Sequence, residues 1–145
     1  MVVKLQEDLK QAQIARDEVK VSTLRLLLSE IKNAEIDKGE QLLNEDIISL
    51  VQREIKKRKE AAAGFRLGSR EEQAQKEEAE LAVLESYLPT QLQFEELTKI
   101  VEETINEVGA TSISDMGKVM SIVMGKVKGQ ADGTAVSSLV KEKLS

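Results

Sequence analysis

The sequence contains no cysteine and no histidine. Without cysteine the chain forms no disulfide and has no thiol nucleophile. Without histidine it has no Cys/His zinc site, no Ser-His-Asp triad and no Cys-His pair. The many carboxylates, serines and lysines follow no catalytic spacing, and no phosphate-loop motif is present. We therefore expect no catalytic residue, no metal ligand and no bound cofactor, and we expect that the chain is not an enzyme on its own.

Aromatic residues and proline are nearly absent as well. The aromatic residues are Phe65, Tyr87 and Phe94, and Pro89 is the single proline. Hydrophobic residues still make up 41% of the 145 residues, so a core is expected and it must be aliphatic. Leu, Glu, Lys, Ala and Gln dominate the rest, and these residues favour helices. The composition predicts an all-α protein.

Long hydrophobic runs are also missing. No apolar segment approaches the ~20 residues that a membrane-spanning helix needs. The first residues, MVVKLQEDLKQ, do not contain the apolar stretch of a signal peptide. On these grounds we predict a cytoplasmic protein that does not contact a membrane.

The net charge of −5 is spread unevenly along the chain. Residues 53–70 carry a net charge of +5, residues 71–108 carry −9, and residues 109–145 carry +2. Charges are screened over about 8 Å at physiological salt, so a polyanion responds to a local patch rather than to the total. The acidic total therefore leaves nucleic-acid binding open.

Helix-start and helix-stop signals divide the first part of the chain into four helices. Asp17 is a plausible N-cap for a second helix that ends at Gly39, and Asn44 is a plausible N-cap for a third. Gly68 interrupts the third helix, and Ser69 followed by Glu72 matches a capping box for a fourth. The acidic start of the fourth helix is expected to pair with the basic third helix in an antiparallel hairpin.

A domain boundary is predicted around Pro89, because proline disfavours helical geometry at the residue before it. We predict an N-terminal helical domain with long helices at residues 1–90 and a compact three-helix domain at residues 91–145. In the second domain, one helix is expected to stop at Gly109, Ser112 or Ser114 to cap the next, and Asp132 to cap the last.

The middle helix of the predicted C-terminal domain has two unusual faces. Its apolar positions recur at helical spacing, which predicts a core-facing stripe; they are Met116, Val119, Met120, Val123, Met124 and Val127. On the neighbouring face, Gly117, Ser121 and Gly125 stack at four-residue spacing and leave a groove almost without side chains. Lysines surround this groove at positions 118, 126 and 128.

Two interpretations of this groove compete. Glycine inside a helix costs about 1 kcal/mol relative to alanine, so two glycines imply close approach by some group. That group is either another helix or an anion such as a nucleic-acid backbone. Lys126 and Lys128 also suit the negative end of the helix dipole, with Gly129 at the C′ position, so neither lysine requires a ligand. The candidate RNA-binding residues are Gly117, Lys118, Gly125, Lys126, Lys128 and Gly129.

A second basic patch is predicted on the third helix. It consists of Arg53, Lys56, Lys57, Arg58 and Lys59. Runs of charge are usually solvated faces, but the excess of one sign makes an electrostatic role a second interpretation.

The motifs DMGKVM at residues 115–120 and VKGQADG at residues 127–133 resemble the YqeY-type family. This family shares its C-terminal domain with the B subunit of the aspartyl/glutamyl-tRNA amidotransferase. STLRLLLSEIKNAEIDKG at residues 22–39 and ESYLP at residues 85–89 are similar to the same family, so the resemblance covers essentially the whole chain.

The resemblance implies a helical N-terminal domain followed by a three-helix tail domain. In the amidotransferase that tail domain helps to bind tRNA, whereas the chemistry lies in parts that this chain lacks. The leading hypothesis is therefore a non-catalytic tRNA-binding or amidotransferase-like accessory protein, with amidotransferase subunits or the tRNA-charging machinery as possible partners. The alternatives are a protein-interaction adaptor and, third, a component of a glutamine-dependent carbon–nitrogen ligase.

Overall fold

A computed structural model describes all 145 residues and contains helices but no strands, which confirms the all-α prediction. The elements are α1 (Val2–Ala15), α2 (Glu18–Lys38), α3 (Asn44–Leu67), α4 (Glu71–Glu85), α5 (Phe94–Val108), the 3₁₀ turn η1 (Ile113–Asp115), α6 (Met116–Val127) and α7 (Gly133–Leu144). The helices fall into two compact units, Met1–Leu88 and Pro89–Ser145. None of the helices has the length and apolar character required to cross a bilayer.

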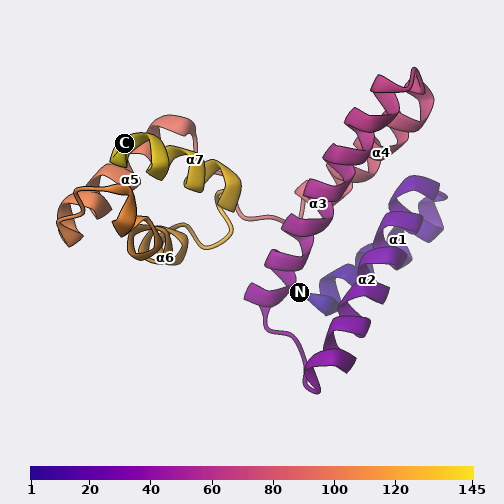
Figure 1. Ribbon diagram of the computed structural model, residues 1–145. Coiled ribbons are helices and arrows are strands. Elements are labelled where there is room, and N and C mark those ends of the chain that lie inside the picture. Colours follow the sequence, from indigo (N-terminus) through magenta and orange to yellow (C-terminus); the bar gives the residue numbers. More distant parts are fainter. The chain divides into compact units, whose positions relative to one another are not determined.

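The first unit is built from two helical hairpins, α1–α2 and α3–α4 (Figure 1). The two hairpins meet mainly where α4 packs against α2. Aliphatic side chains fill the space between the helices, as the scarcity of aromatic residues predicts. The buried core consists of Leu5, Leu24, Leu27, Ile31, Ile47, Leu50, Val51, Ile55, Leu84 and Tyr87.

Three of the predicted helix ends in this unit are confirmed, including the end of α3 at Gly68. The Asp17 carboxylate accepts a 3.1 Å hydrogen bond from the Lys20 amide at the start of α2, and Gly39 closes α2 with a left-handed φ of 78°. The prediction for Asn44 is wrong, because α3 already begins at that residue and Leu43 occupies the N-cap position. A leucine side chain cannot accept a hydrogen bond, so Asp46 reaches back and accepts one from the Leu43 amide at 3.0 Å.

The predicted capping box at Ser69 is also wrong. α4 has Arg70 at its N-cap, and no side chain caps its first turn. Instead, Ser69 has a φ of 59°, and its amide donates to the Arg66 carbonyl while the Arg70 amide donates to Phe65. These two bonds form a Schellman motif, the usual closure of a helix C-terminus. Ser69 therefore ends α3 instead of starting α4.

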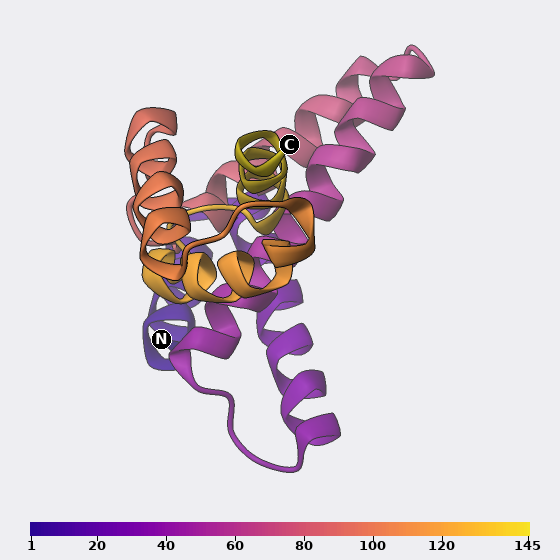
Figure 2. The ribbon, with the colours of Figure 1, turned by 60° about the vertical axis from the view of Figure 1, so that its left-hand side comes forward.

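The second unit packs α5, α6 and α7 against one another, with α6 running across α5 (Figure 2). The predicted stripe on α6 faces this core: Val119, Val123 and Val127 are fully buried, and the three methionines are partly buried against the same cluster. Asp132 caps α7 as predicted by accepting from the Thr134 amide at 3.3 Å. Neither Ser112 nor Ser114 caps α6, because η1 intervenes and Asp115 occupies the N-cap position. The two serine hydroxyls are instead hydrogen-bonded to each other at 2.7 Å.

Candidate nucleic-acid interface

The glycine face of α6 is open to solvent. Gly117, Ser121 and Gly125 are all exposed, and a Cβ atom added at either glycine would have no protein atom within 4 Å. The valine stripe of the same helix faces the core of the second unit, so the helix buries one side and leaves the glycine side free. No helix of this unit occupies the groove that the sequence predicts.

Lys126 differs from the other predicted rim lysines because it is already bound within the unit. Its ammonium group donates to the Thr104 hydroxyl at 2.9 Å and to the Glu107 carboxylate at 3.0 Å, and both partners lie on α5. Thr104 is fully buried, so this contact anchors the end of α6 to α5. Lys143 is engaged in the same way, since Glu102 lies 2.9 Å away and raises the pKa of Lys143.

Lys118 and Lys128 remain as exposed cations beside the glycine face. Neither forms an ion pair within the chain. Lys128 closes α6 in the left-handed region, with a φ of 36°, and Gly129 follows with a φ of 82°. The Gln91 amide nitrogen donates to the Gly129 carbonyl at 3.0 Å, and this bond fixes the loop that carries Lys128.

The six predicted RNA-binding residues therefore divide into two groups. Gly117, Lys118, Gly125 and Lys128 are accessible on α6 and its C-terminal cap. Lys126 and Gly129 hold α6 and its loop in place. The partners of Lys126 were not predicted, because Thr104 and Glu107 lie about 20 residues earlier in the chain and carry no local signal. An open helix face with cations at its edges can accommodate a phosphate backbone at close range.

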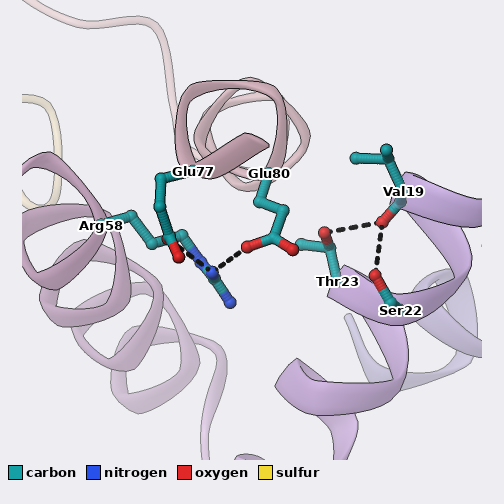
Figure 3. A network of polar contacts seen from close by, with 6 residues as sticks. All are labelled: Val19, Ser22, Thr23, Arg58, Glu77 and Glu80. Atoms are coloured by element: carbon teal, nitrogen blue, oxygen red, sulfur yellow. Dashed lines mark hydrogen bonds and ion pairs between the residues drawn. The ribbon is translucent and has the colours of Figure 1, made fainter. Parts of the chain in front are cut away.

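The basic patch predicted on α3 needs one correction. Arg58 does not contribute to a solvated patch, because its side chain is only 11% exposed and is ion-paired with Glu77 and Glu80 of α4. Figure 3 shows the guanidinium directed at both carboxylates. Lys57 lies 3.4 Å from Glu54, which leaves Arg53, Lys56 and Lys59 as the exposed, unpaired cations of this segment. The predicted pairing between α3 and the acidic α4 is confirmed.

The Arg58 cluster connects three helices. Glu80 is 91% buried and lies where α4 packs on α2. The side chain of the buried Thr23 points toward Glu80 from α2, while its hydroxyl donates to the Val19 carbonyl at 2.7 Å (Figure 3). The Nε atom of Arg58 is buried without a hydrogen-bond partner. The cluster is therefore part of the structural framework of the first unit.

The model of the family described as "Yqey-like protein" matches residues 2–144, nearly the entire chain. The chain belongs to this family. The resemblance identified from the α6 and α2 motifs is thereby confirmed.

Curated relatives carry the name "Altered inheritance of mitochondria protein 41, mitochondrial". The protein from Pyrenophora tritici-repentis is 34% identical over 96% of this chain and 78% of its own length. Those from Vanderwaltozyma polyspora and Kluyveromyces lactis are 38% and 37% identical over 60% and 59% of this chain. The aligned segments amount to about half the length of these two relatives, 48% and 47%.

These names correct the prediction of a cytoplasmic location. That prediction depended on the absence of a signal-peptide core and of a membrane-spanning run, and neither absence distinguishes the cytoplasm from the mitochondrion. The relatives are named as mitochondrial proteins, and this finding overturns the prediction of a cytoplasmic location.

Proposed function

We propose that this chain is a non-catalytic RNA-binding protein, with tRNA as its ligand. The observation that carries the proposal is the solvent-open face of α6, in which Gly117 and Gly125 present bare backbone. A phosphate backbone can approach such a surface more closely than it can approach a face covered by side chains. Exposed, unpaired lysines at positions 118 and 128 supply the positive charge that this approach requires.

The choice of tRNA depends on the family. The resemblance to the tail domain of the amidotransferase B subunit covers α5 to α7, the helices that present this face. The chemistry of that enzyme lies in parts outside the resemblance, so the proposal is binding without turnover. Incubation with glutamine, ATP and mischarged tRNA should yield no product above the protein-free control.

Binding of fluorescently labelled tRNA, measured by anisotropy at several salt concentrations, tests the proposal. Affinity should fall with salt, with a log–log slope of about −0.7 to −0.9 for each phosphate contact. Substituting both Lys118 and Lys128 with Glu should weaken binding and make the slope shallower by roughly 1.5. Lys126 is left unchanged, because its replacement would also remove the contact with Thr104.

A matched control is available in the same unit. Lys99 of α5 and Lys141 of α7 are exposed and unpaired, so K99E/K141E changes the net charge by the same amount on helices other than α6. An equal loss of affinity in both double variants would show that total charge, and not this face, governs binding. Binding that survives K118E/K128E with its salt slope unchanged would exclude the α6 face.

The alternative function is a protein-interaction adaptor in which the groove receives a partner helix. The exposed Gly117–Ser121–Gly125 stripe is also compatible with close helix packing. Partners that are retained after RNase treatment and lost in a variant with bulky residues at both glycines would favour the adaptor.

A further inference from the structure

The α1–α2 hairpin has an apolar groove on its outer surface. Val21 and Leu26 line it together with the side chains of Gln13, Arg16 and Arg25. Leu26 is 45% exposed, and Ile14 of the neighbouring α1 is 67% exposed. The core-facing positions of α2, such as Leu24 and Leu27, are buried on the other side. An apolar surface between charged side chains is typical of a contact surface.

The charges along this groove have a specific order. Glu18 and Arg25 both line it and are seven residues apart on α2. Two helical turns separate them, so they share one face at a distance of about 10.5 Å along the axis. Neither side chain forms an ion pair within the chain. The exposed Ser22 lies midway between them.

This order is self-complementary. A two-fold axis passing near Ser22 places Glu18 of one copy opposite Arg25 of a second copy, and the reverse pair forms by symmetry. We propose that α2 pairs antiparallel with α2 of a second copy of this chain, which forms a homodimer through the α1–α2 groove. Leu26 and Val21 then lie at the contact and are shielded from water.

Ser22 is suited to the centre of such a contact. Its side chain is small, so two α2 helices can approach closely at this position. Its hydroxyl already donates to the Val19 carbonyl at 3.2 Å (Figure 3), so burial at the interface leaves no donor without a partner.

Other occupants fit the charges less well. An acidic helix or an RNA backbone would be repelled by the negative charge of Glu18, and a basic helix would be repelled by Arg16 and Arg25. A second copy offers the opposite charge to both Glu18 and Arg25. The dimer does not depend on the RNA-binding proposal, because this groove and the α6 face belong to different units.

Sedimentation equilibrium of the full chain tests the dimer, with charge reversals as the diagnostic. The wild type should dimerise, and E18R and R25E should each raise the dissociation constant on the order of tenfold by placing like charges opposite each other. The double variant E18R/R25E should restore the wild-type constant, because both pairs re-form with inverted sign. Circular dichroism checks that each variant keeps its helix content.

Cysteine cross-linking gives a second, independent measurement because the chain has no cysteine of its own. S22C should form an intermolecular disulfide under mild oxidation, since two-fold symmetry brings the two sulfur atoms together. The matched control is S49C on the exposed surface of α3, which should remain uncoupled. The proposal is overturned by a monomeric wild type, by a double variant no better than the single ones, or by equal cross-linking of S22C and S49C.

Discussion

The Tyr87 hydroxyl donates a 2.6 Å hydrogen bond to the Asp8 carboxylate and joins the residue just after α4 to α1. The phenol ring is buried in the core of the first unit, and the Lys4 ammonium lies 5.8 Å from its centroid. Burial, the hydrogen bond and the negative charge of Asp8 raise the pKa of Tyr87 well above its ordinary value. One aromatic side chain therefore links the first and last helices of this unit.

Replacing Tyr87 with Phe should lower the free energy of unfolding by about 1.5–3 kcal/mol, because the ring is kept and the hydrogen bond to a charged acceptor is lost. The wild type should also lose stability as the pH rises above 10. In that range the unfolded chain releases the phenol proton, whereas the folded chain, with its raised pKa, retains it. Urea unfolding at neutral and at alkaline pH measures both effects.

The loss of stability at alkaline pH should be smaller in Y87F, because the phenylalanine ring has no proton to release. Lysines also titrate near this range, so the difference between the two proteins is the diagnostic quantity. Identical pH profiles for wild type and Y87F would show that burial and the Asp8 contact do not raise the pKa of Tyr87 in the folded chain.

Arg58 is the side chain whose loss should be most destabilising among the cations of α3. Replacing it with Met should lower the free energy of unfolding by about 2–4 kcal/mol, because Glu77 and the buried Glu80 would be left without a counter-charge. The exposed Arg53 provides the control, and R53M should change stability by less than about 0.5 kcal/mol. Urea denaturation of both variants gives the comparison.

A compensating variant distinguishes the loss of the Arg58 charge from the loss of its packing. If uncompensated carboxylates cause the loss, then R58M combined with E77Q and E80Q should recover part of the stability, since neutral amides are less costly to bury. A triple variant as unstable as R58M would instead assign the effect to the shape of the Arg58 side chain.

Local sequence signals predicted the fold class and several helix ends. Each confirmed cap forms its hydrogen bonds within four residues of its own position, so the neighbouring sequence is sufficient to identify it. This holds for Asp17, Gly39 and Asp132. The same is true of the valine stripe on α6, because its period alone requires one buried face.

Two errors arise where a distant partner decides the outcome. In the sequence Arg58 lies within a basic run typical of a solvated face, but α4 places two carboxylates beside it. The sequence places Lys126 among the cations around the groove, but Thr104 and Glu107 of α5 bind its ammonium group. A third error is local, because Ser69 fits two motifs and the closure of α3 prevails by satisfying two backbone amides at once. Pairing across helices is not encoded in the spacing of nearby residues.

Ser69 also gives a stability prediction. It occupies the left-handed position of the Schellman motif, where glycine is normally found because it has no Cβ atom to strain the backbone. Replacing Ser69 with Gly should raise the free energy of unfolding by about 0.5–1 kcal/mol. Thermal and urea unfolding measure the change, and a clear loss of stability in S69G would show that the serine side chain makes a contact that outweighs the strain.

The glycines of the second unit should respond to alanine in opposite directions. Gly125 lies within α6 with open space around it, so G125A should raise the free energy of unfolding by about 0.5–1 kcal/mol. Gly109 has a φ of 66°, so G109A should lower it by about 1–2 kcal/mol. The opposite signs in urea denaturation distinguish a glycine kept for its backbone geometry from one that the fold does not require.

A glycine that the fold does not require is the residue expected where a ligand approaches the backbone. Replacing both Gly117 and Gly125 with Leu should leave the helices folded, because neither new side chain meets a protein atom within reach of its Cβ. The same variant should weaken tRNA binding at least tenfold in the anisotropy measurement, because two isobutyl groups would hold the phosphate backbone away from α6. G117A/G125A should bind more tightly than the leucine variant, since a methyl group projects less far. Full affinity in a folded G117L/G125L protein would assign the open face of α6 to something other than RNA.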